Sequence, residues 1–152
     1  MSYKGIYRPS NPKKYKGDHR NIIYRSLWER KFMNYCDLNE NVIEWASEEF
    51  WIPYKDPTTN RVRRYFPDFF IKYQDTNGKK RSVVIEVKPK KQCKAPPKNP
   101  KRRTKAWAHD VQTWVINQAK WEAAEQYCAD RKYEFKIMTE DDLGISHDRR
   151  RY

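Results

Sequence analysis

Two acidic residues stand in otherwise apolar stretches of the sequence and could together hold a metal ion. Asp68 follows Pro67 and precedes the apolar residues 69–71, and Glu86 lies among β-branched residues, two positions before Lys88. Burying two unpaired carboxylates is costly, and a divalent cation would relieve that cost. Mg²⁺ is usually held by one or two carboxylates with water and phosphate oxygens. These residue types predict a Mg²⁺ (or Mn²⁺) site beside a lysine that can stabilise charge on a phosphate.

The segments that carry the two acids have the pattern of paired strands. Residues 65–71 and 82–88 are rich in β-branched and aromatic side chains, which is typical of strands. The dipeptide Asn77-Gly78 between them is a strong hairpin signal. Side chains two apart on a strand share a face, so Glu86 and Lys88 point the same way. The hairpin would therefore bring both acids and the lysine to one end of a small sheet.

Each of these residues also has an ordinary explanation. An Asp after a Pro is typical of a turn, and Glu-x-Lys on a strand is typical of an exposed ion pair. In combination, Pro67-Asp68 followed by Glu86-Val87-Lys88 resembles the signature of the PD-(D/E)xK nuclease superfamily. The resemblance implies a metal-dependent deoxyribonuclease. In it, Asp68, Glu86 and the Val87 carbonyl bind the metal, and Lys88 lies by the attacking water and the scissile phosphate.

A third acid, Glu29, has two competing interpretations. The pattern of residues 26–39 predicts a helix, which would begin with a capping box formed by Ser26 and Glu29. Capping alone would explain Glu29. However, residues 26–32 (Ser-Leu-Trp-Glu-Arg-Lys-Phe) also resemble the first helix of head-completion nucleases of large tailed phages and of TnsA-type transposon endonucleases. That resemblance implies a catalytic Glu29 that orients the attacking water.

Composition bounds the class of protein. The 152 residues suit one compact domain. A net charge of +13, from 33 basic and 20 acidic side chains, predicts a polyanionic partner such as DNA. No apolar run approaches the roughly 18 residues of a membrane span, and the first residues lack a secretion signal core. Three widely spaced cysteines indicate neither a zinc site nor a disulfide framework.

Basic side chains are concentrated in three segments. Residues 1–20 predict a flexible basic arm, residues 89–105 a basic proline-rich loop, and residues 146–152 a basic tail, which leaves residues 21–145 as the nuclease domain. Such charge runs are often only solvated, but the loop directly follows the expected catalytic strand and could clamp DNA. The predicted DNA contacts are Arg61, Arg63, Arg64, Lys98, Lys101, Arg102 and Arg103.

The other predicted strands and the long helix indicate the fold class. Residues 42–46 and 50–54 predict strands, residues 107–130 a long helix and residues 133–139 a last strand. This order matches a restriction-endonuclease-like α/β core, in which helices flank a mixed sheet. Two polar residues of the long helix, Gln118 and Lys120, are surface side chains by default, because the sequence fixes no register for them.

The resemblance to head-completion nucleases also implies a biological setting. It predicts a phage protein that processes packaged DNA ends during head completion, in the host cytoplasm or the virion, with DNA and phage head or neck proteins as partners. Two alternatives stay open: a non-catalytic DNA-binding virion assembly protein, and a TnsA-like transposase subunit. The acidic pair argues against a pure binder, because such a protein has no reason to bring two carboxylates to where phosphates arrive.

Overall fold

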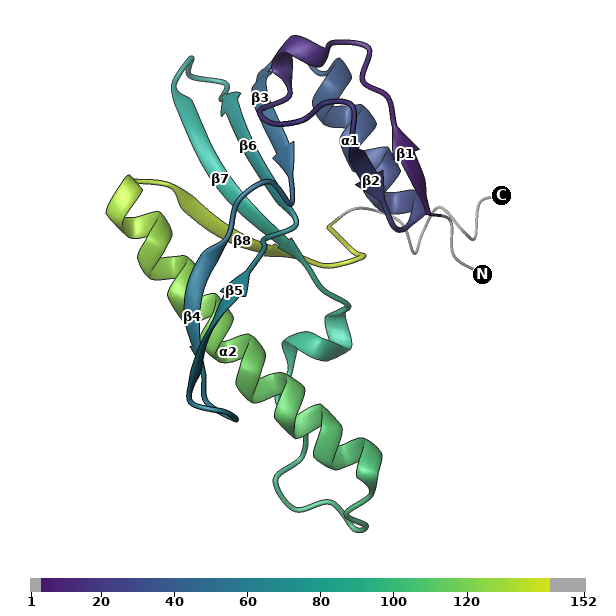
Figure 1. Cartoon of the computed structure of the whole chain (residues 1–152), viewed down its shortest axis with the longest axis vertical. Helices are drawn as coiled ribbons and strands as arrows, with labels where there is room; N and C mark the ends of the chain where they lie inside the picture. Colours follow the sequence, from purple (N-terminus) through teal and green to yellow (C-terminus); the bar gives the residue numbers. More distant parts are fainter. Residues whose placement is uncertain (1–3, 143–152) are drawn as a thin grey trace.

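A mixed four-stranded sheet forms the centre of the molecule (Figure 1). The computed structural model describes residues 4–142. The strand order is β3-β6-β7-β8, in which β3, β6 and β7 are antiparallel and β8 runs parallel to β7. The strands are β3 (Val42–Ser47), β6 (Phe69–Gln74), β7 (Lys80–Val87) and β8 (Glu134–Met138). The predicted mixed sheet of a restriction-endonuclease-like α/β fold is confirmed.

The hairpin of β6 and β7 determines which residues lie opposite each other at the end of the sheet. Its turn includes Gly78 at φ 79°, where a residue with a Cβ would be strained. The register pairs Phe69 with Ile85, so Asp68 and Glu86, one step further along, lie opposite each other. β6 begins at Phe69 rather than at residue 65, because Pro67 has no N–H to donate and interrupts the strand.

Two short antiparallel sheets flank the central one. β1 (Gly5–Tyr7) pairs with β2 (Ile22–Tyr24), and β4 (Ile52–Asp56) pairs with β5 (Arg61–Tyr65). The segment predicted as a strand at residues 50–54 therefore belongs to a separate hairpin. Figure 1 shows this β4–β5 hairpin lying along the long helix, away from the central sheet.

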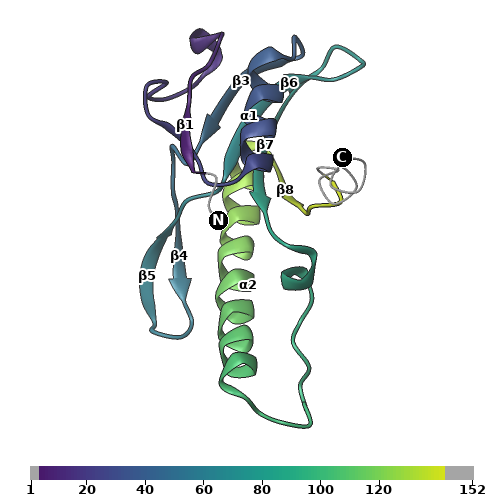
Figure 2. The same ribbon diagram turned by 90° about the vertical axis from the view of Figure 1, so that its right-hand side faces the viewer.

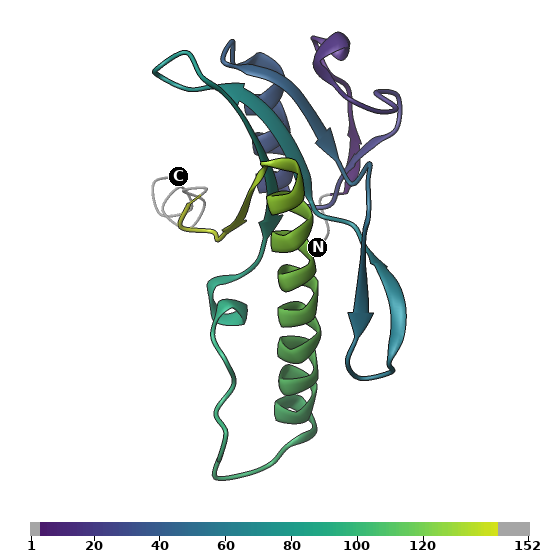
Figure 3. The same ribbon diagram turned by 90° about the vertical axis from the view of Figure 1, so that its left-hand side faces the viewer.

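The two α-helices lie on opposite faces of the central sheet (Figures 2 and 3). They are α1 (Leu27–Leu38) and α2 (Lys105–Arg131). Phe32 of α1 packs on Phe69, with ring centroids 4.6 Å apart. Trp121 and Ala124 of α2 are buried in the core formed with the β4–β5 hairpin. The prediction that helices flank the sheet is confirmed, and both helices begin one or two residues from the predicted position.

The N-terminal segment differs from the flexible arm that its composition predicts. Residues 4–20 include β1 and a short 3₁₀ turn, η1 (Pro12–Lys14). Tyr7 and Tyr15 are buried and meet Trp45 edge to face. The buried Asp37 carboxylate accepts hydrogen bonds from two main-chain N–H groups of this segment. Aromatic burial and this acceptor outweigh the basic, proline-containing composition.

The segment after β7 leads away from the sheet. It contains one 3₁₀ turn, η2 (Lys90–Cys93), and then irregular chain that runs beside α2 to reach its start (Figures 1 and 2). The predicted basic tail at residues 146–152 lies outside the described residues. Within residues 4–142, no helix combines the length and the apolar character that a membrane crossing requires.

Candidate active site

The hairpin brings together the two acids and the lysine that the sequence singled out. Glu86 is 5% exposed, and Asp68 is mostly buried beside it. The Val87 N–H donates to Asp68 Oδ2 at 2.8 Å. Lys88 Nζ lies 3.5 Å from Glu86 Oε2, so these two side chains share a face as predicted.

The electrostatics of the pair favour a cation. Burial, and then the negative charge of Asp68, raise the pKa of Glu86 to about 7, although Lys88 opposes the shift. Burial also raises the pKa of Asp68, while the Val87 N–H and Lys88 act in the opposite direction. Two buried carboxylates that resist ionisation together would ionise readily around a divalent cation.

The donor set fits a hard cation such as Mg²⁺. Across residues 4–142, no group of three or more His, Cys, Asp or Glu side chains is placed to enclose a metal. Zinc usually needs such a set of protein ligands, whereas Mg²⁺ accepts one or two carboxylates and completes its shell with water and phosphate oxygens. Asp68 and Glu86 therefore supply what Mg²⁺ requires from protein side chains.

Glu29 joins this cluster and also caps α1. The Glu29 N–H donates to Ser26 Oγ at 3.2 Å, and Glu29 Oε1 accepts from the Arg25 N–H at 2.7 Å. The Glu29 carboxylate therefore accepts from the N–H of Arg25, the residue before the N-cap, rather than from the N–H of Ser26 as in a standard capping box. Burial raises the pKa of Glu29, and the charges of Asp68 and Glu48 raise it further. The two interpretations of Glu29 are thus compatible in one position.

Glu48 is a residue at the site that the sequence did not reveal. It follows β3 and has a φ of 53°, a left-handed conformation that costs a non-glycine residue about 1 kcal/mol. Its N–H donates to the Asp68 carbonyl at 3.2 Å. Arg25 Nη1 binds both carboxylate oxygens of Glu48 at 2.8 Å. No turn signal marks the position, because Gly, Asn and Asp are the usual residues there.

Lys120 of α2 also reaches the site, which settles the helix register that the sequence left open. Its Nζ lies 5.8 Å from the ring centre of Tyr54 and 5.6 Å from that of Tyr65. Burial lowers the pKa of Lys120, and the charge of Lys88 lowers it further. Gln118, two residues earlier, is exposed on another side of the helix.

Tyr65 lies beside both Lys120 and Glu86. Its hydroxyl is buried and lies beside the Glu86 carboxylate. Burial, and then the charge of Glu86, raise the pKa of this hydroxyl, so it stays protonated. The sequence showed Tyr65 only as a strand residue, without a signal for the site.

The three predicted arginines lie near the site but not on one surface. Arg61, Arg63 and Arg64 are all exposed on β5. Arg63 Nε binds Asp56 at 3.0 Å, on the side of the hairpin that faces α2. Arg64 lies over the Trp51 ring at 4.7 Å, and its position in the strand places it on the opposite face.

The basic residues of the loop are further from the acids. Lys98, Lys101, Arg102 and Arg103 are exposed where the loop turns into α2. The rise along α2 from Lys105 to Lys120 is about 22 Å. The structure therefore does not bring these four side chains over the acidic pair. It places them at the far end of the helix (Figure 1).

Comparison with known proteins identifies the family. Residues 39–140 match the family described as TnsA-like endonuclease N terminal. The chain belongs to this TnsA-like endonuclease family. It is also 40% identical over 147 residues to the head completion nuclease of Enterobacteria phage T4, which covers 94% of this chain and 95% of that protein. The chain is therefore a deoxyribonuclease, and both resemblances read from the sequence are confirmed.

The family match also bears on the site of this TnsA-like nuclease. Asp68, Glu86, Lys88 and Lys120 all lie within the matched residues, and Glu29 precedes them. We predict the individual catalytic roles of these residues from the geometry of the site.

Proposed function

We propose that this nuclease is a Mg²⁺-dependent endonuclease that hydrolyses phosphodiester bonds of DNA. One observation carries the proposal: the buried Glu86 and the mostly buried Asp68 face each other across a strand pair, and the Lys88 ammonium lies 3.5 Å from Glu86. A non-catalytic DNA-binding protein gains nothing from this pair, because buried acids repel phosphates and destabilise the fold.

Each residue of the cluster would have a distinct role in hydrolysis. Asp68, Glu86 and the Val87 carbonyl would hold the cation, which when bound neutralises charge that develops on the phosphate oxygens. Lys88 adds a positive charge beside Glu86 that can contact the scissile phosphate. Lys120 adds a second, from the helix side. Both ammonium groups would stabilise the negative transition state.

Glu29 is suited to handle the proton of the attacking water. The raised pKa of its carboxylate makes it a better proton acceptor than an ordinary exposed glutamate. Its hydrogen bond from the Arg25 N–H fixes one carboxylate oxygen and leaves the other available. The water oxygen attacks phosphorus as Glu29 takes its proton, and the bond from phosphorus to the leaving sugar oxygen breaks.

The biological substrate follows from the phage relative. That relative is named a head completion nuclease, and the match extends over nearly the whole of both chains. We propose that this nuclease likewise processes packaged DNA ends during head completion, together with phage head or neck proteins. It would act in the host cytoplasm or within the virion. A transposase-subunit role rests on the family match alone, which covers residues 39–140.

Plasmid nicking tests the proposal. Purified protein should convert supercoiled DNA to nicked or linear forms with Mg²⁺ or Mn²⁺, and EDTA should stop the reaction. Asp68→Ala is the matched negative control, since it removes one proposed ligand. Cleavage that persists in EDTA, or that Asp68→Ala performs as well as the wild type, would contradict the assignment. Comparison of closed circles with linear duplexes of different ends then tests the preference for ends.

A further inference from the structure

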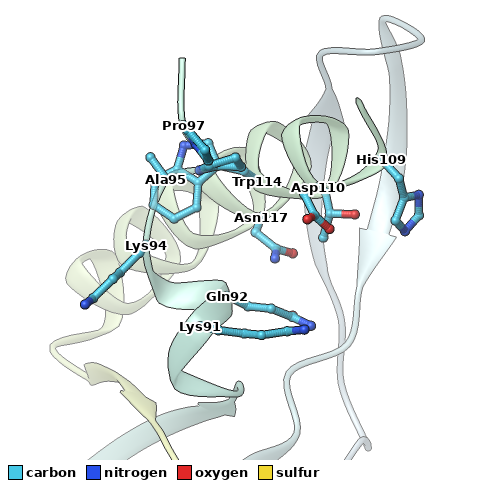
Figure 4. A pocket seen from close by; sticks show the side chains of 11 residues that line it. Lys91, Gln92, Lys94, Ala95, Pro97, His109, Asp110, Trp114 and Asn117 are labelled. Atoms are coloured by element: carbon cyan, nitrogen blue, oxygen red, sulfur yellow. The ribbon is translucent and has the colours of Figure 1, made fainter. Parts of the chain in front are cut away.

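A pocket of about 410 Å³ lies between the segment after β7 and the first half of α2. This volume is within the range of sites for small organic ligands. Lys91, Lys94 and Pro97 contribute from one side, and Trp114 and Asn117 from the helix (Figure 4). The cluster of acids described above does not line it. The pocket is therefore a separate feature that needs its own explanation.

The pocket has a polar group at its base that lacks a partner. Asn117 is 3% exposed, and its side-chain nitrogen is buried without a hydrogen bond to any of the described residues. Figure 4 shows this amide directed from α2 toward Lys91 and Gln92, across the pocket. A buried donor without an acceptor is costly and rare in native proteins. A ligand with an acceptor at this depth would satisfy it.

The walls of the pocket suit an aromatic, anionic ligand. The Trp114 indole lines it and offers a flat apolar surface for stacking. Lys91 and Lys94 are exposed at its edge, and Asp110 is the one acid among the described residues that line it. An Asn side chain can pair with a base edge through one donor and one acceptor. An aromatic ring, an amide and two lysines together match a nucleotide.

The pocket is held in shape and lies next to the proposed active site. Trp107 Nε1 donates to the Pro97 carbonyl at 2.7 Å, which ties the loop to the start of α2. Asn117 is three residues from Lys120, or about 4.5 Å along the helix axis. Lys91 follows Lys88 by three residues. The two segments that form the pocket therefore also carry Lys120 and Lys88 of the proposed active site.

We propose that this pocket binds one unpaired nucleotide of the DNA strand beside the scissile phosphate. The base stacks on Trp114 and meets the Asn117 amide, and Lys91 and Lys94 contact its flanking phosphates. A base within a duplex cannot enter such a pocket unless it leaves the stack, so the enzyme should favour DNA that has an unpaired nucleotide near the cut. This inference rests on the proposed nuclease function and specifies its substrate.

Binding in EDTA tests the pocket without cleavage. Two labelled duplexes are compared by anisotropy: one fully paired, and one with a single unpaired 2-aminopurine that also reports stacking by its fluorescence. The wild type should bind the second about tenfold more tightly and quench its fluorescence. Trp114→Ala and Asn117→Leu should abolish the preference and keep the affinity for the paired duplex.

Matched controls distinguish the pocket from general damage. Gln112→Ala, at an exposed position of α2, should keep the full preference. Asn117→Leu should melt at the same temperature as the wild type or higher, because it removes a buried unpartnered amide. Equal affinity of the wild type for both duplexes, or an unchanged preference in Asn117→Leu, would overturn the inference. Because these assays omit metal, loss of the preference and loss of Mg²⁺-dependent cleavage are separate results.

Discussion

Two regions of this nuclease carry opposite charge in opposite surroundings. At the end of the central sheet, Asp68 and Glu86 are largely buried and adjoin Glu29, Lys88 and Lys120. In the loop before α2, the side chains of Lys98, Lys101, Arg102 and Arg103 are exposed. Charges in the first region interact strongly because water is excluded, whereas those in the second are screened by salt.

The difference indicates that the buried region controls catalysis and that the exposed loop controls affinity for DNA. A single altered charge in the buried region changes every neighbouring group, so activity should fall abruptly. In the exposed region each cation adds a similar small amount to DNA affinity, so loss should be gradual. The predictions below test this division, from the largest expected effect to the smallest.

The largest effect is expected for the two carboxylates. Asp68→Asn and Glu86→Gln should each lower single-turnover cleavage by about 10³-fold or more, because a lost metal ligand removes several kcal/mol of charge stabilisation. Their thermal stability without metal should be equal to that of the wild type or higher, since each substitution removes a buried charge. Cleavage within tenfold of the wild type by both variants would place the chemistry elsewhere.

Glu29 should show a smaller loss of rate. Glu29→Gln keeps an oxygen that can accept from the Arg25 N–H, so its melting temperature should change little. Loss of a general base should still lower cleavage by about 10²-fold. Ser26→Ala is the matched control, because it loses a cap worth about 1 kcal/mol but should keep the rate. If Glu29→Gln cleaves normally, the residue is only a cap.

The loop should control affinity and its dependence on salt. Replacing Lys98, Lys101, Arg102 and Arg103 with Ala should reduce the slope of log affinity against log salt by up to about 3 to 4 units, with cleavage at saturating DNA nearly unchanged. Lys79→Ala with Lys80→Ala, where the turn of the β6–β7 hairpin leads into β7, is the control. An unchanged slope in the loop variant would shift the DNA path to the arginines of β5.

The subtlest effect concerns pH and stability without metal. The pKa of Glu86 is about 7 in the folded protein and lies near 4.5 for an ordinary glutamate. Between these values the unfolded chain releases a proton that the folded protein keeps, so the free energy of unfolding should fall as pH rises from about 4.5 to about 7.

Melting temperatures in EDTA and in Mg²⁺ across this range would measure the effect. Mg²⁺ should stabilise the protein most above about pH 7, where it binds the ionised pair without displacing a proton. Glu86→Gln should flatten the dependence on pH in EDTA. A wild-type protein that becomes more stable over this range would contradict the raised pKa.

Much of the site could be predicted because it depends on local pattern. The Asn77-Gly78 turn was enough to bring the Asp68 region beside the Glu86 region, and the alternation of β7 put Lys88 on the same face as Glu86. The exact register, which sets Asp68 opposite Glu86, comes from the structure. α1 and its Ser26 cap were also visible in the sequence. Each of these features is determined by residues close together in the chain, where propensity and periodicity are informative.

The parts that could not be predicted depend on tertiary contacts. Glu48 adopts a left-handed conformation that its residue type does not favour, and only its neighbours in the fold explain it. Lys120 reaches the acids because α2 packs along the β4–β5 hairpin, which fixes a register that the sequence does not encode locally. The N-terminal segment looked disordered by composition, but Tyr7 and Tyr15 anchor it on Trp45.

Calorimetric titration with Mn²⁺ in the absence of DNA tests most directly whether the buried acids hold a metal. At mildly alkaline pH the wild type should bind Mn²⁺, and Mg²⁺ should compete for the same site. Asp68→Asn should lose most of this binding while it still melts cooperatively and still binds DNA in EDTA. Equal Mn²⁺ affinity in the wild type and in Asp68→Asn would contradict the account, since the metal would then lie outside the acidic pair.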